Sequence, residues 1–175
     1  MRVITLLLLL CTSLGTYAAT FSVPGADITF DAPNGFTSLS KDEISVKFPS
    51  NRTPSDVVGN RARTTTITFE LKQDRLAPEQ LAEVKQTFEQ YFEAAVPRLE
   101  WKERKIVDLN GMKWIQLEFS SRATDTDIHN VMLITSRYGR MLIFNFNSTR
   151  SEFPSVARSI RASILSIKSK PASSK

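Results

Sequence analysis

The sequence predicts an α+β fold: a mainly antiparallel sheet with one helix on each face, which makes a three-layer α/β/α sandwich. The first observation is the stretch 112–147, which holds most of the apolar side chains that the chain could bury and indicates three long strands in succession. The second is that these strands are apolar on both faces, and such strands require cover on both sides. The third is a pair of amphipathic helical patterns elsewhere in the chain that would supply the two covers.

Length and composition indicate one globular domain. The chain has 175 residues and is 41% apolar, with six Gly and eight Pro, which is enough for a core without disulfide or metal staples. The net charge of +5 favours anionic partners. The basic residues are interleaved with 18 acids, so the pattern does not predict nucleic-acid binding.

The N-terminus has the pattern of a secretory signal peptide. Arg2 precedes an apolar run from Val3 to Cys11, and Thr16-Tyr17-Ala18 supplies small residues at the cleavage site. Residues 1–19 are therefore predicted to be removed, leaving a periplasmic or secreted protein without stable membrane insertion. Cys11 is the only cysteine, so the mature chain would lack disulfides, Cys nucleophiles and Cys-ligated metals.

The N-terminal third predicts short strands and one long loop. Residues 21–23 and 28–30 read as a hairpin around the turn residues 24–27. The period-two series Ile44, Val46, Phe48 predicts a third strand. Residues 50–63 predict an irregular connection, and alternation resumes in 64–71.

The first helix is predicted to begin at Pro78 and to stop at Pro97. Its apolar stripe recurs at spacings of three and four residues. The stripe consists of Leu81, Val84, Phe88, Tyr91, Phe92 and Ala95. At helical spacing, these residues indicate core packing.

Two hairpins follow. Asn110-Gly111 is a strong two-residue turn signal and would place Leu109 opposite Met112 and Val107 opposite Trp114. A second hairpin would turn at Gly139-Arg140. Its strands would set Val131, Leu133, Leu142, Phe144 and Phe146 on one face. The other face would carry Met132, Ile134, Tyr138, Met141 and Ile143, beside Asn145 and Asn147.

The last helix would be capped by Thr149 or Ser151, with Pro154 in its first turn. Its apolar stripe consists of Phe153, Val156, Ala157, Ile160, Ile164 and Ile167, with Arg158 and Arg161 facing water. A single sandwich domain would then span residues 20–168, and residues 169–175 would form a disordered tail.

The order of elements resembles the fold that PsbP-like and DcrB-like proteins share. The matching segments are Pro33-Asn34-Gly35-Phe36, Phe48-Pro49, Val107 to Met112, Gly139 to Leu142 and a last helix rich in Ser and Ile. The resemblance covers nearly all of the mature chain. It implies non-enzymatic binding roles such as partner recognition or assembly, and it supplies no catalytic residues.

Two features are candidate partner-binding surfaces. Arg52, Arg61 and Arg63 lie in the irregular connection, where guanidinium groups would meet carboxylates or phosphates or would simply keep the protein soluble. Trp114, with Val107, Leu109 and Met112, forms an apolar patch that either receives a helix or faces a partner.

Asp125, Asp127 and His129 form the candidate metal site. They alternate along the chain, so on an extended segment they would point the same way and would offer two carboxylates and an imidazole to a divalent cation. The alternative is a solvated loop leading into a strand.

These observations predict a secreted or periplasmic protein-binding module, non-enzymatic and without a cofactor. Its partner would be another protein, as for an immunity-type inhibitor or an envelope assembly factor or chaperone. One alternative is a metal-dependent protein or enzyme that uses residues 125–129. Another is a binder of anionic cell-wall or lipid surfaces. No phosphate loop, dinucleotide motif or nucleophile elbow occurs in the sequence.

Overall fold

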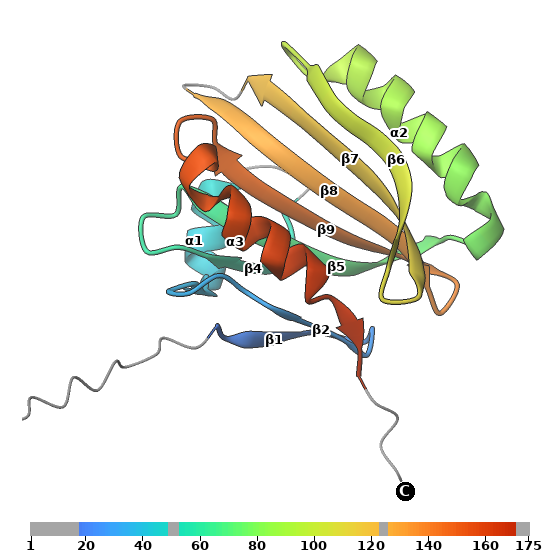
Figure 1. Ribbon diagram of the computed structural model, residues 1–175, viewed down its shortest axis with the longest axis horizontal. Helices are drawn as coiled ribbons and strands as arrows, with labels where there is room; N and C mark the ends of the chain where they lie inside the picture. The colour runs from blue at the N-terminus through green and yellow to red at the C-terminus, as the bar shows by residue number, and fades with distance from the viewer. Residues whose placement is uncertain (1–17, 49–52, 123–125, 171–175) are drawn as a thin grey trace, which may run out of the picture.

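A seven-stranded antiparallel sheet forms the middle layer of the structure, a computed structural model that describes residues 18–48, 53–122 and 126–170. The strand order is β3-β4-β5-β9-β8-β7-β6 (Figure 1). The strands are β3 (Thr37–Ser38), β4 (Asp56–Gly59), β5 (Thr65–Arg75), β6 (Glu100–Leu109), β7 (Met112–Arg122), β8 (Asp127–Arg137) and β9 (Arg140–Thr149). The predicted α+β fold is confirmed.

One face of this sheet is covered by α3 (Phe153–Leu165) and by a small second sheet. The second sheet consists of β1 (Thr20–Val23), β2 (Ile28–Asp31) and β10 (Lys168–Ser169), in the order β1-β2-β10. In Figure 1, α3 crosses in front of β9 and leads into β10, which lies beside the N-terminal hairpin. The first and last elements of the domain therefore close the same layer.

The opposite face carries two helices at its two ends. The helix α2 (Leu81–Ala95), preceded by the 3-10 turn η1 (Pro78–Gln80), packs over β7. The short helix α1 (Lys41–Lys47) packs over β4 through Ile44, Leu39 and Val57. Among the described residues, no helix covers the strands between α1 and α2 on this face.

Both hairpin turns depend on positive φ angles. Asn110 and Gly111 have φ values of 52° and 78°, and Tyr138 and Gly139 have values of 55° and 69°, as a two-residue turn requires. The pairs Leu109–Met112 and Val107–Trp114 are confirmed. The turn at Gly139-Arg140 was predicted one residue too late, because Arg140 already pairs with Arg137.

The core has two main parts, one on each face of the sheet. The α3 side contains Trp114, Phe144, Phe146 and Ile160, and the α2 side contains Ile115, Leu117, Phe119 and Ile134. Trp114 has an exposed fraction of 0%, and its ring packs against Phe144. It is therefore a core residue, and the interpretation of Trp114 as a partner-binding surface residue is wrong.

The predicted third strand at Ile44–Phe48 is a helix. Glu43 N donates to Ser40 Oγ at 3.2 Å, and Ser40 N donates to Glu43 Oε2 at 2.8 Å, which is a complete capping box. Only Ile44 points inward, whereas Val46 has an exposed fraction of 80%. The capping box fixes the helix start, and this local hydrogen bonding outweighs the period-two apolar pattern.

Three other expectations change in detail. Residues 56–59, expected to be irregular, form β4. Ser169, expected in the disordered tail, pairs with Ile28, and Lys170 N donates to Asp27 O at 2.8 Å. The last helix has Glu152 as its N-cap residue, with no side-chain cap from Thr149 or Ser151. Residues 171–175 and most of the predicted signal peptide lie outside the described residues.

Within the described ranges, no helix has the length and hydropathy that crossing a membrane requires.

Replacing Trp114 by Ala is expected to lower the free energy of unfolding by about 4 kcal/mol, because it opens a cavity among fully buried side chains. Denaturant unfolding followed by circular dichroism measures this change. Val46→Ala is the control and should change the free energy by about 0.5 kcal/mol or less, because its side chain is exposed. A Trp114→Ala variant as stable as the wild type would contradict the core assignment.

Candidate functional site

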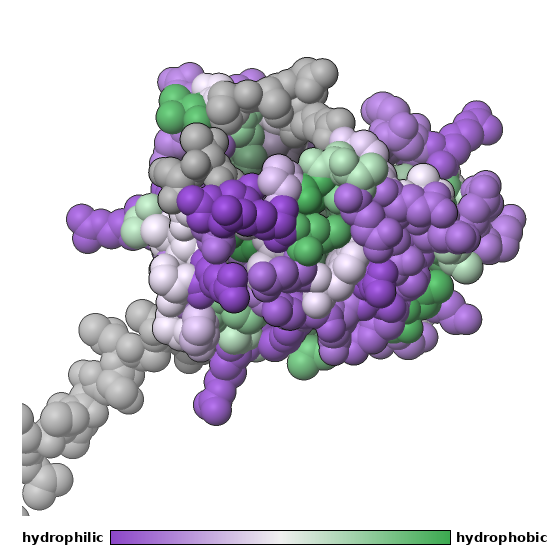
Figure 2. All heavy atoms as spheres, turned by 90° about the horizontal axis from the view of Figure 1, so that it is seen from above, coloured by the Kyte–Doolittle hydropathy of each residue, from purple (hydrophilic) through white to green (hydrophobic). Residues whose placement is uncertain are grey.

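A polar groove lies on the sheet between α1 and α2. It consists of two adjoining cavities of about 690 and 180 Å³, and both are lined by Phe48, Asn145 and Asn147. The larger cavity reaches the end of the sheet where β7 and β9 stop, with Ser121 and Thr149 in its lining. Figure 2 views the molecule from above and shows hydrophobic surface visible between hydrophilic regions.

Neutral polar side chains form the floor of this groove in rows that cross the strands. Thr66 on β5, Asn147 on β9 and Asn130 on β8 are paired neighbours in one row. Thr68, Asn145 and Met132 make the next row. Directly paired residues of an antiparallel sheet point to the same face. These two rows are therefore an array of amide and hydroxyl groups interrupted by one apolar side chain, Met132.

Two amide oxygens of the floor lack a hydrogen-bond partner among the described residues. The Oδ1 atoms of Asn145 and Asn147 are buried and accept no hydrogen bond. A side-chain amide has an acceptor end and a donor end, and turning it over would bury the donor instead. Solvent or a ligand in the groove can satisfy these buried oxygens, and each costs about 1–3 kcal/mol if neither does.

The alternation of β9 explains why these amides sit in the groove. Phe144 and Phe146 point to the α3 side and are buried, so Asn145 and Asn147 point to the opposite face. Further along that face, Ile143 contacts the α2 core. From the sequence, Asn145 and Asn147 were expected on this face beside apolar residues, and they were not predicted to form a site. The signal was present, because two polar residues replace apolar ones at alternate positions.

Lys47 lines the wall of the groove at its α1 end. Its Nζ donates to Arg63 O at 2.7 Å, and it forms no ion pair with a carboxylate among the described residues. Although the side chain as a whole is exposed, partial burial of the ammonium, and secondarily Arg63, lower the pKa of Lys47. The groove therefore has an unpaired cation at one end.

Of the three arginines predicted to face a partner, Arg63 has a structural role. Its guanidinium donates to Glu43 Oε1 at 2.9 and 3.0 Å, to Thr37 Oγ1 at 3.1 Å, and to the carbonyls of Gly59 and Asn60 at 3.0 and 3.1 Å. These bonds fasten α1 to β3 and β4. Arg61 is exposed, and Arg52 lies outside the described residues.

The structure does not bring Asp127 and His129 together as metal ligands. Asp127 pairs with Arg122 at 3.1 Å and Arg150 at 3.6 Å. His129 has an exposed fraction of 8%, and its Nε2 lies 2.8 Å from Glu118 Oε1. Within the described residues, no group of three His, Cys, Asp or Glu side chains is placed to hold a metal ion. The third predicted ligand, Asp125, lies outside those residues.

His129 belongs instead to a buried ionic cluster under α3. Arg161 Nη2 donates to both carboxylate oxygens of Glu118 at 2.6 Å, and the His129 ring stacks on Phe153 at 3.5 Å between centroids. Arg161, expected to face water, thus reaches the sheet. Burial raises the pKa of Glu118, but the hydrogen bonds from His129 and Arg161 together outweigh it, so the net pKa is lowered. The cluster fastens α3 to β7 and β8.

The search of protein-family models finds no match, and neither does the search of curated proteins. Solved structures do match. The PsbP of the cyanobacterium Synechocystis sp. PCC 6803 (CyanoP) has a TM-score of 0.61 and 14% identity, over 91% of this chain and 96% of that chain. The chain has the PsbP-like fold. The predicted fold resemblance is confirmed.

Two further proteins share this PsbP-like fold. A Pseudomonas aeruginosa protein of unknown function, PA94, described as a putative regulator, matches with a TM-score of 0.53 and 11% identity, over 89% of this chain and 99% of that chain. LpqN, involved in cell envelope biogenesis of Mycobacterium tuberculosis, matches with a TM-score of 0.55 and 14% identity, over 90% of this chain and 88% of that chain. At these identities, the likeness concerns the fold alone.

Glu118→Gln is expected to lower the free energy of unfolding at pH 7 by about 2 kcal/mol, because it removes the charge that Arg161 and His129 contact. Because the pKa of Glu118 is lower in the folded state than in the unfolded state, its ionised form stabilises the fold at pH values above the ordinary glutamate pKa. This stabilisation is lost as the pH falls towards and through the lowered pKa of the folded state. The gap between wild type and variant should therefore narrow from about pH 5 to pH 3.

Denaturant unfolding across this pH range measures the gap. Glu100→Gln is the matched control, because Glu100 is exposed and its ion pairs with described residues are long, at 3.5 and 3.8 Å. This control should differ from the wild type by about 0.5 kcal/mol or less at every pH. A Glu118→Gln deficit that stays constant down to pH 3 would contradict the ionised state of Glu118.

Proposed function

We propose that the protein is a non-enzymatic binding module of the cell envelope and that it binds another protein through the polar groove. The observation that carries this proposal is the pair of buried, unpartnered amide oxygens of Asn145 and Asn147 in the floor of a cavity of about 690 Å³. Cavities of roughly 300–1,000 Å³ with a few convergent polar groups are typical binding sites.

The chemistry of the groove supports binding. Most of its floor is made of amide and hydroxyl side chains from β5, β8 and β9, which donate and accept hydrogen bonds but do not exchange protons near neutral pH. The charged residues in the lining of the smaller cavity, Glu70 and Lys72, form an ion pair with each other. The ionisable residues His129 and Glu118 lie under α3, on the face of the sheet opposite the groove. Glu118 accepts a hydrogen bond from Arg161 and contacts His129, and the His129 ring stacks on Phe153.

The envelope location is supported by two independent observations. The N-terminal sequence has the pattern of a secretory signal peptide, and a protein of the same fold, LpqN, is involved in cell envelope biogenesis. An immunity-type inhibitor and an envelope assembly factor or chaperone are the two specific forms of the proposal. Both require a defined protein partner that occupies the groove.

A double variant, Asn145→Leu with Asn147→Leu, is expected to remove partner binding while keeping the fold. Leu has a similar size, prefers strands at least as well as Asn, and leaves no unpaired amide. Tagged wild-type and variant proteins would be used to capture partners from native envelope extracts. The wild type should retain a defined protein that the variant loses.

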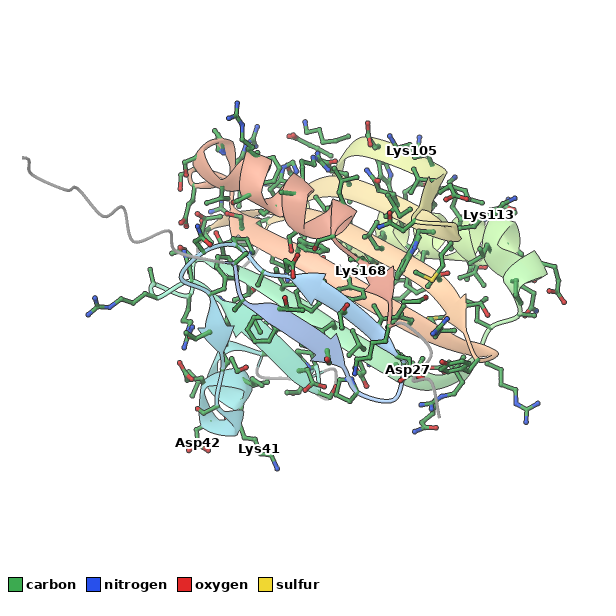
Figure 3. All side chains as sticks on the ribbon, turned by 60° about the horizontal axis from the view of Figure 1, so that its bottom comes forward. Asp27, Lys41, Asp42, Lys105, Lys113 and Lys168 are labelled. Carbon is green, nitrogen blue, oxygen red and sulfur yellow. The ribbon has the colours of Figure 1, made fainter. Side chains whose placement is uncertain are left out.

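The control is Lys105→Met, on the sheet face opposite the groove. Lys105 projects from β6 at a place well separated from α1 (Figure 3), so this variant should retain the same partner as the wild type. Capture of an identical set of proteins by all three baits would overturn the groove as the binding site.

The same double variant is expected to unfold with a free energy equal to or up to about 2 kcal/mol above that of the wild type, since the unpartnered amides are removed. Thermal and denaturant unfolding measure this change. A loss of more than about 1 kcal/mol would show that the two amides support the fold instead of serving a ligand.

A further inference from the structure

We infer that the groove takes an extended peptide segment of the partner and that Lys47 binds an acidic residue of this segment. This inference rests on the proposed function, since it specifies the chemistry of the ligand at the same site. It depends on three features of the described residues: the spacing of Asn145 and Asn147, the apolar side chains beside them, and the unpaired ammonium of Lys47.

The two unpartnered amides have the repeat of an extended chain. Asn145 and Asn147 lie two residues apart on one strand, so their side chains repeat at about 6.8 Å. An extended peptide lying along β9 presents a backbone N–H or C=O to the same side at the same interval. Each amide would then meet one peptide group of the ligand, and both buried oxygens would accept a backbone N–H.

The remaining polar groups of the floor extend this match. Thr66 and Thr68 flank the two Asn residues on β5, and Asn130 flanks Asn147 on β8. Two neighbouring rows of the floor are uncharged. One consists of Thr66, Asn147 and Asn130, and the other consists of Thr68, Asn145 and Met132. A neutral array of donors and acceptors suits peptide groups, whose hydrogen bonds need no counter-charge.

Apolar side chains line the groove where alternate ligand side chains would fall. Ile128 lies across the sheet from Thr149, and Met132 lies across from Asn145, while Phe48 and Pro54 line the wall nearest α1. In an extended peptide whose N–H edge faces the floor, successive side chains point alternately to the two flanks of the groove. These apolar groups would therefore bury side chains between the backbone contacts.

Lys47 supplies the charged contact. It shares its end of the groove with Arg63, whose charge is compensated by Glu43. The Lys47 ammonium has only the carbonyl oxygen of Arg63 as an acceptor among the described residues. A cation at the wall of a groove that has no carboxylate partner gains from a carboxylate ligand, because the two form a charge-assisted hydrogen bond. An Asp or Glu of the peptide would fill this role.

The test uses a display library of random heptapeptides selected on the mature wild-type protein, with the Asn145→Leu, Asn147→Leu double variant as the counter-selection bait. Enriched peptides should share an Asp or Glu at one fixed position and should lack Pro at alternate positions, where the backbone N–H is needed. The strongest peptide is then synthesised, and its affinity is measured by fluorescence polarisation.

Three affinities decide the outcome. The double variant should bind the peptide at least about tenfold more weakly than the wild type, because two backbone contacts are lost. Lys47→Met should weaken binding about fivefold, and should have no effect on a peptide whose acid is replaced by its amide. Lys105→Met, which removes the same charge from the other face of the sheet, should bind as the wild type does. Thermal unfolding verifies that each variant is folded.

Several results would overturn the inference. One is the absence of peptides enriched on the wild type over the double variant. Another is an enriched peptide whose affinity does not depend on Lys47. Saturable binding of a neutral oligosaccharide, maltohexaose, that the double variant loses would assign the groove to glycans instead.

The two proposals fail separately. If the double variant loses a captured envelope protein but no peptide is selected, the groove binds a folded surface, and only the extended-peptide inference is overturned. If peptides bind in the groove while capture of the envelope protein does not depend on Asn145 and Asn147, the proposed function of the groove in that capture is overturned.

Discussion

The structure depends on one constraint: the central sheet is apolar on both faces, and each face must be shielded from water. On one face the shield is continuous, because α3 and the small sheet of β1, β2 and β10 together cover the buried aromatic residues Trp114, Phe144 and Phe146. On the other face the shield is divided between α2 and the short helix α1. The arrangement in Figure 1 follows from this division.

The groove exists where the second shield is interrupted, and the sequence changes at the same place. Along β9, the residues on this face are apolar at Ile143, near the α2 core, and become polar at Asn145 and Asn147. A strand that merely needed to be soluble would carry charged residues with solvated heads at these positions. Two uncharged amides whose buried oxygens have no partner among the described residues cost stability unless solvent or a ligand satisfies them, and functional sites can carry such costs.

Most of the fold could be predicted from local patterns, because period-two and helical spacing reflect burial that occurs within single elements. The strands of both long hairpins, α2 and α3 were found in this way. One exception is α1, where the apolar spacing of Ile44, Val46 and Phe48 suggested a strand although Ser40 and Glu43 already formed a capping-box signature. The short β10 was missed because two polar residues carry no periodic signal.

The candidate site was less accessible to sequence analysis, because a groove is defined by where the covering helices end, and no local pattern encodes that. The spacing of Asp127 and His129 suggested a ligand set, yet the side chains that they contact come from distant positions, Glu118 on β7 for His129 and Arg150 after β9 for Asp127. The sequence likewise suggested that Arg63 could bind a partner, because its hydrogen-bond acceptors Glu43 and Thr37 lie 20 and 26 residues away in the chain and approach it only in the fold. Trp114 required knowledge of which helix covers its face.

The most direct test of the central claim, that the interrupted cover makes a binding site, is amide hydrogen exchange of the protein with and without its captured partner. Binding in the groove predicts slower exchange in β5, β8 and β9 around Thr66, Asn130 and Asn147, and in α1 near Lys47, with α3 and β6 unchanged. Protection confined to α3, β6 or the small sheet, with the groove strands exchanging as in the free protein, would contradict the account.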